Sequence, residues 1–242
     1  MWYIGGKYRQ SRGIVECIRP HAEDGFTYVE PFCGGMWSAA RVCGDLRPGR
    51  VILNDVNRPL VLLWRRVLDE GVDWLPADKS EIEANYRYYK YDAPDDDPLK
   101  AWYGIACSFG GKWFGGVARS KGKTDFKPRV RSTARKADAL RSCHPELSWG
   151  SYKELSIPDG SVVYCDPPYQ GRVKAHYFES FDYDEFWQWV RDLSSRCTVF
   201  TSCFEFPEDF REVYRWGDTV VRHNHGHGPD GTCERMVVYD AN

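Results

Sequence analysis

The stretch TYVEPFCGGMWSAARVCGDLRPGRVILND, residues 27–55, decides the fold of this chain. Its first part, residues 27–32, predicts a strand that runs into a pair of glycines. A helix is predicted over 37–43, and an apolar run at 51–54 predicts a second strand. The order of strand, helix and strand is typical of a parallel, doubly wound α/β sheet.

The same alternation appears on both sides of a long middle segment. A helix is predicted over 58–70, where apolar side chains recur at helical spacing. Later in the chain the pattern predicts strands at 161–165, 198–201, 219–222 and 235–239, and a helix over 183–193. Residues 76–149 contain no run typical of a buried strand. We therefore expect an α/β domain formed by residues 1–75 and 150–242, interrupted by an insertion at 76–149.

The charges are unevenly distributed along the 242 residues. The whole chain carries 33 Lys and Arg against 35 Asp and Glu, which argues against a uniformly basic nucleic-acid coat. Between residues 112 and 141, however, ten basic residues stand against two acidic ones. The near-neutral total therefore hides a strongly basic segment inside the expected insertion.

The cysteines and the apolar runs indicate where the protein resides. Nine cysteines are scattered without CxxC pairs, and the first residues form no apolar leader. No segment reaches the roughly 18 apolar residues that a membrane span needs. These features predict reduced thiols in a cytoplasmic protein. A histidine-rich run at 223–227 lacks a second ligand pair at zinc spacing, so no metal site is predicted.

The tetrapeptide Asp166-Pro167-Pro168-Tyr169 directly follows the strand predicted at 161–165. In open α/β sheets, ligands bind outside the carboxyl ends of the strands, so this loop faces a site. Two prolines stiffen the turn, while the carboxylate and the carbonyls supply acceptors beside an aromatic ring. Such a rigid acceptor cluster suits the exocyclic amino group of a planar base. The structural alternative is a chance turn after a strand.

A second site signal lies between the first two predicted strands. The glycine turn that follows Glu30 contains neither a dinucleotide fingerprint nor a P-loop, which disfavours NAD and ATP. Asp55 ends the second strand 21 residues after Gly34, where an acid typically binds ribose hydroxyls. A nucleoside cofactor without a phosphate, S-adenosylmethionine, fits this combination.

Four motifs together resemble the Dam-type (D12 class) DNA adenine-N6 methyltransferases over essentially the whole chain. They begin at Tyr3, Glu30, Asn54 and Asp166 and read YIGGK, EPFCG, NDVN and DPPY. The resemblance implies a Rossmann-like S-adenosylmethionine methyltransferase sheet with a mostly helical target-recognition insertion. It also implies an adenine-specific enzyme that acts on duplex DNA in a bacterial cell or a phage-infected host.

The resemblance implies a role for each matching residue. Those expected at the cofactor are Tyr3, Gly6, Lys7, Glu30, Phe32, Gly34, Asp55 and Asp166. Those expected in catalysis are Asp166, Pro167, Pro168 and Tyr169. The acid and a backbone carbonyl, that of Pro167, would hold the N6 hydrogens of a flipped adenine while Tyr169 stacks on its ring. No metal and no covalent enzyme intermediate is required.

The basic segment supplies candidate DNA contacts. The residues expected to bind DNA are Lys112, Arg119, Lys121, Arg129 and Arg131. The alternative for any one of them is a solvated surface charge.

Two positions depart from the family pattern. Met36 stands where the second glycine of the turn is expected, which predicts a differently formed turn and weaker cofactor binding. Ser151 stands where an acid often precedes the tyrosine, so one contact to the cofactor's adenine is lost or is made by Ser151. Two other functions therefore stay open. One is methylation of an exocyclic amine in RNA or of cytosine N4, and the other is DNA binding with weak catalysis.

Overall fold

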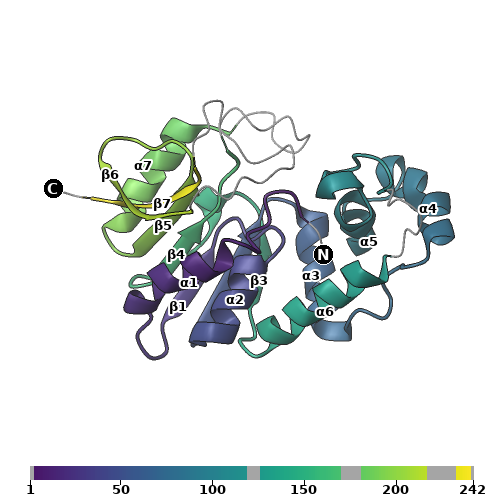
Figure 1. Cartoon of the computed structure of the whole chain (residues 1–242), viewed down its shortest axis with the longest axis horizontal. Helices are drawn as coiled ribbons and strands as arrows, with labels where there is room; N and C mark the ends of the chain where they lie inside the picture. The colour runs from purple at the N-terminus through teal and green to yellow at the C-terminus, as the bar shows by residue number, and fades with distance from the viewer. Residues whose placement is uncertain (1–2, 119–125, 170–180, 217–232, 241–242) are drawn as a thin grey trace.

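The computed structural model describes residues 3–118, 126–169, 181–216 and 233–240. These residues form a mixed sheet of seven strands in the order β3-β2-β1-β4-β5-β7-β6 (Figure 1). The strands are β1 (Thr27–Glu30), β2 (Arg50–Asp55), β3 (Glu146–Trp149), β4 (Val162–Cys165), β5 (Thr198–Cys203), β6 (Phe210–Arg215) and β7 (Arg235–Tyr239). The five strands from β3 to β5 are parallel, while β7 lies antiparallel between β5 and β6. The expected α/β class and doubly wound sheet are confirmed.

The strand order reverses between β1 and β4. From β1 the sheet is built outward through β2 to β3, and the chain then returns to place β4 on the other side of β1. A reversal of this kind opens a crevice at the carboxyl ends of the two central strands. Glu30 ends β1 and Cys165 ends β4, so the glycine turn and the Asp166 loop both leave the sheet at this crevice.

The elements that the structure describes between β2 and β3 are all helices or helical turns. After α3 (Arg58–Glu70) it forms α4 (Lys79–Tyr91), α5 (Pro98–Ala101), a π-helical turn η2 (Trp102–Ala106), a 3-10 turn η3 (Phe109–Gly111) and α6 (Lys127–Arg141). Helices α4 and α5 lie beyond α3, away from the sheet (Figure 1). Asp78 caps α4 by accepting from the Glu81 N–H at 3.0 Å.

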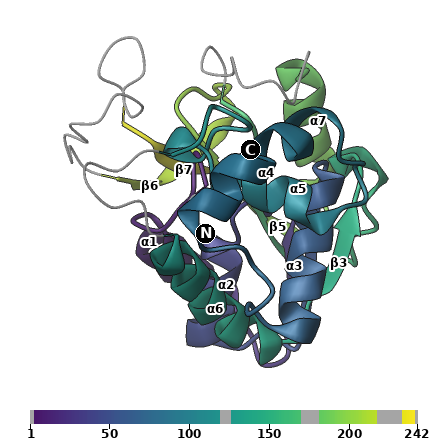
Figure 2. The same cartoon turned by 90° about the vertical axis from the view of Figure 1, so that its right-hand side faces the viewer.

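Helix α6 brings the chain back to the sheet domain. It runs alongside α2 (Trp37–Leu46), as Figure 2 shows. Arg141, in its last turn, donates to the carbonyl oxygens of Val67 and Leu68 at 2.7 and 2.9 Å, near the end of α3. Residues 146–149 then form β3 at the sheet edge, although no strand was expected within 76–149. This strand is partly exposed and has no apolar run, which is why its pattern gave no signal.

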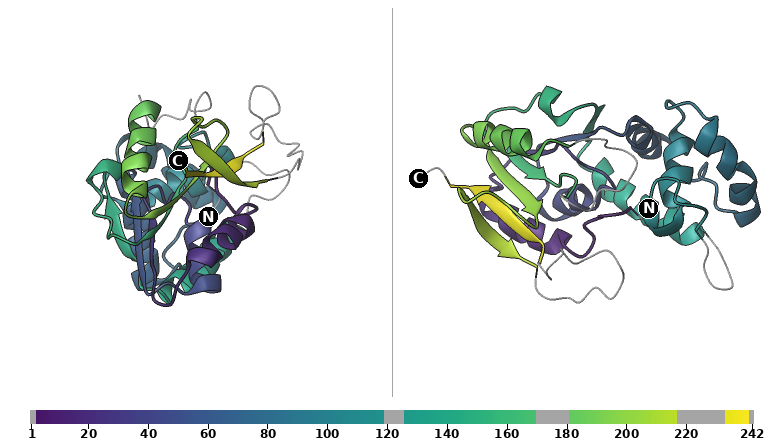
Figure 3. Two further views of the ribbon diagram at one scale, coloured as in Figure 1. Left: turned by 90° about the vertical axis from the view of Figure 1, so that its left-hand side faces the viewer. Right: turned by 90° about the horizontal axis from the view of Figure 1, so that it is seen from above.

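The two faces of the sheet pack against different helices. Alternate strand residues such as Tyr28, Leu53 and Tyr164 share a core with α1 (Ser11–Ile18), α2 and α3. Their neighbours on the other face share a second core with α7 (Tyr183–Ser194). Figure 3 (left) shows α1 and α7 on opposite sides of the strands. Figure 3 (right) shows the helical segment to one side of the sheet domain.

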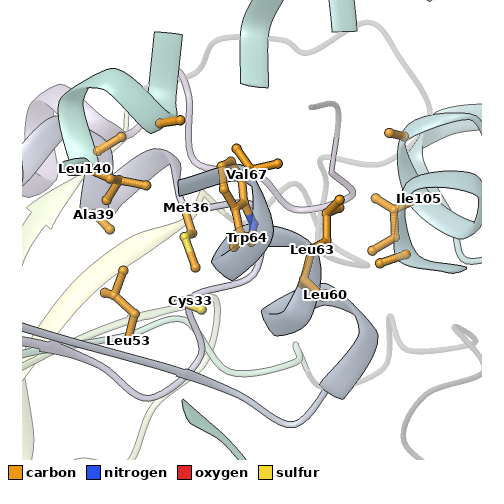
Figure 4. Packing of buried hydrophobic residues seen from close by; sticks show 14 of the residues in the cluster. Cys33, Met36, Ala39, Leu53, Leu60, Leu63, Trp64, Val67, Ile105 and Leu140 are labelled. Atoms are coloured by element: carbon orange, nitrogen blue, oxygen red, sulfur yellow. The ribbon is translucent and has the colours of Figure 1, made fainter. Parts of the chain in front are cut away.

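Helix α3 connects the sheet to the inserted helices. Its start is fixed by the Asn57 side chain, which accepts from the Leu60 N–H at 3.3 Å. Leu60, Leu63, Trp64 and Val67 recur at helical spacing and are fully buried, as the sequence predicts. In Figure 4 the Trp64 side chain lies close to Met36, and Leu63 points toward Ile105 of the η2 turn.

Several expectations have simple outcomes. The strand expected at 219–222 lies outside the described residues, and β6 at Phe210–Arg215 was not predicted. All nine cysteines are described and are free thiols. Among the described residues, no helix has both the length and the apolar character needed to cross a membrane.

Candidate active site

Asp55 fixes the glycine turn to the end of β2. One carboxylate oxygen accepts from the Gly34 N–H at 2.8 Å and the other accepts from the Asn57 N–H at 2.9 Å. Burial raises the pKa of Asp55 to about 6, although both backbone hydrogen bonds act in the opposite direction. Each oxygen keeps a second lone pair for a ligand. The glycine turn and Asp55, which the sequence predicts to lie in one site, are therefore in direct contact through a hydrogen bond.

Met36 has a backbone conformation that favours glycine. Its φ is 55° and its ψ is 32°, which places it in the left-handed region at the start of α2. Such a conformation costs a non-glycine residue roughly 1–2 kcal/mol. The side chain is fully buried and lies close to Trp64 (Figure 4), and this burial offsets the cost. The turn therefore forms with methionine at this position, and weaker cofactor binding stays a prediction.

Tyr3 lies against the two glycines that precede Met36. A Cβ atom built on Gly34 would come within 2.9 Å of the Tyr3 ring, and one built on Gly35 within 2.7 Å of the Tyr3 Cβ. Only glycine allows this close approach. Burial raises the pKa of the Tyr3 hydroxyl, and the nearby carboxylates of Asp55 and Asp166 add to the shift. Tyr3 thus lies near both acids expected at the site.

Lys7 joins the N-terminal motif to the DPPY loop. Its Nζ lies 2.7 Å from Asp166 Oδ1 and 3.1 Å from Glu234 Oε1, and its side chain is only 5% exposed. Nζ also donates to Tyr169 Oη at 2.6 Å. Burial lowers the pKa of Lys7, but the two carboxylates outweigh burial and raise it overall. Lys7 is therefore held as a cation among these acids.

The Tyr169 hydroxyl lies between two acids. Oη is 2.9 Å from Asp166 Oδ1 and 2.7 Å from Glu234 Oε1. A phenol has a single proton to donate, so only one of these carboxylates receives it at a time. The Tyr169 ring also contacts the Phe204 ring edge-on, with centroids 4.8 Å apart. In this arrangement the hydroxyl of the residue expected to stack on adenine is engaged with Asp166.

Glu234 was not identified from the sequence. It directly precedes β7, and its other oxygen accepts from Gln10 Nε2 at 3.0 Å. No motif contains this residue. Only the position of β7 between β5 and β6 brings it to Lys7, so no local pattern indicated it.

Glu30, the last residue of β1, is buried beside this cluster. Tyr28 Oη donates to its Oε1 at 2.6 Å, while Oε2 has no hydrogen-bond partner in the described part of the chain. Burial raises the pKa of Glu30 to about 8, although the hydroxyl groups of Tyr28 and Ser38 act in the opposite direction. An unpartnered carboxylate oxygen is costly in a folded interior and suits a site that binds an amino group of a ligand.

An aromatic wall borders the site on the α7 side of the sheet. The Phe32 ring lies 5.2 Å from the Tyr152 ring and 5.9 Å from that of Phe186, measured between centroids. Ser151 accepts from the Lys153 N–H at 3.3 Å and caps the turn that positions Tyr152. Ser151 therefore helps to place the aromatic ring of Tyr152, while its contact to the cofactor's adenine stays a prediction.

The described residues expected to bind DNA have different surroundings. Arg129 donates to the Ala106 carbonyl oxygen and lies 4.8 Å above the Phe126 ring, so its guanidinium is engaged within the helical segment. Lys112 is half-buried and Arg131 is exposed. Arg119 and Lys121 lie outside the described residues, as does the histidine-rich run at 223–227. Within the described ranges no cluster of His, Cys, Asp and Glu could hold a metal ion.

A protein-family model matches the first part of the chain. The model of the D12 class N6 adenine-specific DNA methyltransferases matches residues 3–143, more than half of the chain. The matched region contains the glycine turn, Asp55 and the helical segment up to the end of α6, and it ends before the DPPY loop.

Solved structures of methyltransferases also resemble the chain. The rRNA methyltransferase aviRa from Streptomyces viridochromogenes aligns with 96% of this chain and 84% of its own, at 14% identity and a TM-score of 0.45. SMU.472, a putative methyltransferase complexed with SAH, aligns with 96% of this chain and 53% of its own, at 10% identity and a TM-score of 0.36. Neither likeness bears on the substrate of this chain.

Proposed function

Because the chain belongs to the D12 class of N6 adenine-specific DNA methyltransferases, we propose that it methylates adenine N6 in duplex DNA. Members of this class use S-adenosylmethionine as the methyl donor. The observation that carries the proposal is the contact between Lys7 and Asp166 at 2.7 Å. It joins the N-terminal cofactor motif to the DPPY loop at the crevice where the sheet order reverses.

The residues present fit S-adenosylmethionine. Asp55, held by two backbone N–H groups, would accept hydrogen bonds from the ribose hydroxyls. The unpartnered oxygen of Glu30 would accept from the ammonium group of the methionine part. Phe32 and Tyr152 supply flat apolar surface for the adenine ring. When bound, the cofactor supplies a methyl group that is already activated on its sulfonium.

Asp166 is the proposed acceptor for the target amine. The hydrogen bond from Tyr169 and the ion pair with Lys7 both involve its Oδ1 atom. Oδ2 is thus the oxygen that we assign to the N6 hydrogens, with the carbonyl of Pro167 as the second acceptor. Accepting these hydrogens localises the nitrogen lone pair and orients it for attack. The surplus proton leaves to Asp166 or to water.

Tyr169 is the proposed stacking surface for a flipped adenine. Extrusion of a base costs a few kcal/mol of unstacking, and an aromatic face offsets part of that cost. Tyr169 is held by hydrogen bonds to Lys7 and Asp166, which fix the ring beside the acceptor.

We assign residues 76–149 to target recognition and residues 1–75 and 150–242 to catalysis, with β3 at the end of the insertion as part of the sheet. The support is the basic composition of the segment from 112 to 141. Basic residues there would neutralise DNA phosphates, which gives binding a steep dependence on salt. The candidate contacts are Lys112, Arg119, Lys121 and Arg131, while Arg129 is the weakest candidate because Ala106 engages it.

Expression in a methylation-deficient bacterial host tests the proposal. Mapping of modified bases in the host genome should find N6-methyladenine at a defined sequence with wild-type protein and none with Asp166→Ala. Methylation of cytosine N4 or of RNA would assign the protein to one of the alternative activities. A genome without any modified base, from a soluble protein that binds cofactor and DNA, would favour a weakly catalytic DNA-binding protein.

A further inference from the structure

Lys136 is a buried cation in helix α6 that contacts the glycine turn. Its side chain is 2% exposed, and its Nζ donates to the carbonyl oxygen of Gly35. Burial of an ammonium group is costly unless specific partners compensate. Burial indeed lowers the pKa of Lys136 to about 7. Lys136 therefore differs from a basic residue that contacts only solvent or DNA, because its amino group is buried against the glycine turn.

Two indole rings surround the Lys136 ammonium. Nζ lies 4.5 Å from the centroid of the Trp37 ring and 4.7 Å from that of Trp64. Cation–π contacts at such distances stabilise a desolvated cation. Among the ion pairs of the described residues, none includes Lys136. The residue thus joins α6 to the start of α2 and to α3.

The partners of Lys136 belong to the cofactor side of the site. Gly35 is the residue against which Tyr3 packs, since a Cβ there would lie 2.7 Å from the Tyr3 Cβ. Trp37 also lies against the N-terminal motif, because a Cβ atom built on Gly6 would come within 3.3 Å of its ring. A shift of the Lys136 side chain would therefore disturb the turn and the N-terminal motif together.

The same helix carries exposed basic side chains. Arg131 and Arg135 are both exposed on α6, and they lie five residues and one residue before Lys136. A single rigid element thus extends from positions available to DNA phosphates to the carbonyl of the glycine turn. Occupation of one end of such an element can bias the other.

We infer that Lys136 is a positioning residue that couples DNA binding by the insertion to cofactor binding at the glycine turn. The inference rests on the proposed function. It requires that duplex DNA tightens cofactor binding and that cofactor tightens DNA binding by the same factor. Lys136 would transmit this effect by holding the Gly35 carbonyl in the arrangement that receives the cofactor.

The test compares three proteins by one ratio, the dissociation constant for S-adenosylhomocysteine without DNA divided by that with DNA. S-adenosylhomocysteine, which cannot react, is titrated by calorimetry with and without a saturating adenine-containing duplex. Wild type should bind it about 5-fold or more tighter with DNA present, the lower end of typical coupling. Lys136→Met, which keeps the side-chain length without the charge, should bring this ratio close to 1. Arg135→Met removes the same charge from the exposed face of α6, so it should weaken DNA binding and keep the wild-type ratio.

Hydrogen exchange of the wild-type protein makes the test independent of whether Lys136→Met folds. Addition of duplex alone should slow amide exchange in the peptide that spans residues 33–40. A wild-type ratio near 1, a Lys136→Met ratio equal to that of wild type, or unchanged exchange in this peptide would overturn the inference. A protein that binds and methylates DNA without such coupling refutes only the role of Lys136. A protein that does not bind duplex DNA refutes the proposed function itself.

Discussion

Lys7 and Asp166, which are far apart in the sequence, form an ion pair of 2.7 Å at the carboxyl end of the sheet. The lysine side chain is nearly inaccessible, and Glu234 and Tyr169 complete its surroundings. Burial raises the pKa of Asp166 overall, and the nearby Lys7 ammonium opposes this shift by favouring the charged form of the proposed acceptor. The cofactor motif and the catalytic loop therefore depend on each other.

Replacement of Lys7 by methionine should strongly destabilise the protein. Removing one partner of a buried ion pair leaves carboxylates uncompensated and costs about 3–5 kcal/mol. Urea unfolding measures the loss. The exposed pair of Arg12 and Glu16, 2.9 Å apart, provides the control, and Arg12→Met should cost less than about 1 kcal/mol. Equal losses in the two variants would contradict the role given to Lys7.

Asp55 should make stability depend on pH between about 4 and about 6. Burial raises its folded-state pKa to about 6 from the usual 3.8. The folded chain therefore holds this proton more tightly than the unfolded chain, and stability falls as the pH rises through this window. Across this window the free energy of unfolding should fall by at most about 3 kcal/mol, and Asp55→Asn should remove this decrease. Urea unfolding of both proteins at several pH values checks this, and identical slopes would refute it.

At position 36, glycine should be more stabilising than alanine. Both Met36→Gly and Met36→Ala lose the buried side chain, at a cost of about 2–5 kcal/mol. Only glycine adopts a φ of 55° without strain. The free energy of unfolding, measured with urea, should therefore be about 1 kcal/mol higher for Met36→Gly than for Met36→Ala. Inside an ordinary helix the order of these residues is reversed. A higher free energy of unfolding for Met36→Ala than for Met36→Gly would contradict a left-handed conformation at position 36.

Gly35→Ala should weaken cofactor binding. The new methyl group would lie 2.7 Å from the Tyr3 Cβ, so the N-terminal motif must move away from the turn. We expect the dissociation constant for S-adenosylmethionine, measured by calorimetry, to rise at least tenfold. Gly44→Ala in α2 is the matched control, since its Cβ would meet nothing within 4 Å. An unchanged dissociation constant in Gly35→Ala would show that the contact between Tyr3 and the glycine turn does not contribute to cofactor binding.

The sequence predicted the parts of the molecule whose signals are local. The strand, turn and helix from 27 to 55 and the helix at Arg58–Glu70 have strong apolar periodicity, and the structure contains them. Strands β3 and β6 were missed because each lies at an edge of the sheet and has partly exposed, charged side chains. Edge strands need no continuous apolar run, so their pattern resembles that of a loop.

Long-range packing accounts for the other differences. Glu234 carries no motif and reaches Lys7 only because β7 inserts between two other strands. Lys136 and Arg129 occur in a basic run that reads as solvent-exposed or DNA-facing. The structure instead engages both with backbone carbonyl oxygens, those of Gly35 and Ala106. Charge patterning indicates the composition of a surface but not which of its cations are buried.

The most direct test of adenine-N6 methylation is analysis of the product nucleoside. Purified protein is incubated with S-adenosylmethionine labelled in the methyl group and with an adenine-containing duplex, which is then digested to nucleosides and separated by chromatography. The account predicts that the label elutes with N6-methyldeoxyadenosine, and that Asp166→Asn, with cofactor affinity retained, loses at least about 1000-fold in rate. Label in any other nucleoside, or full activity in Asp166→Asn, would contradict it.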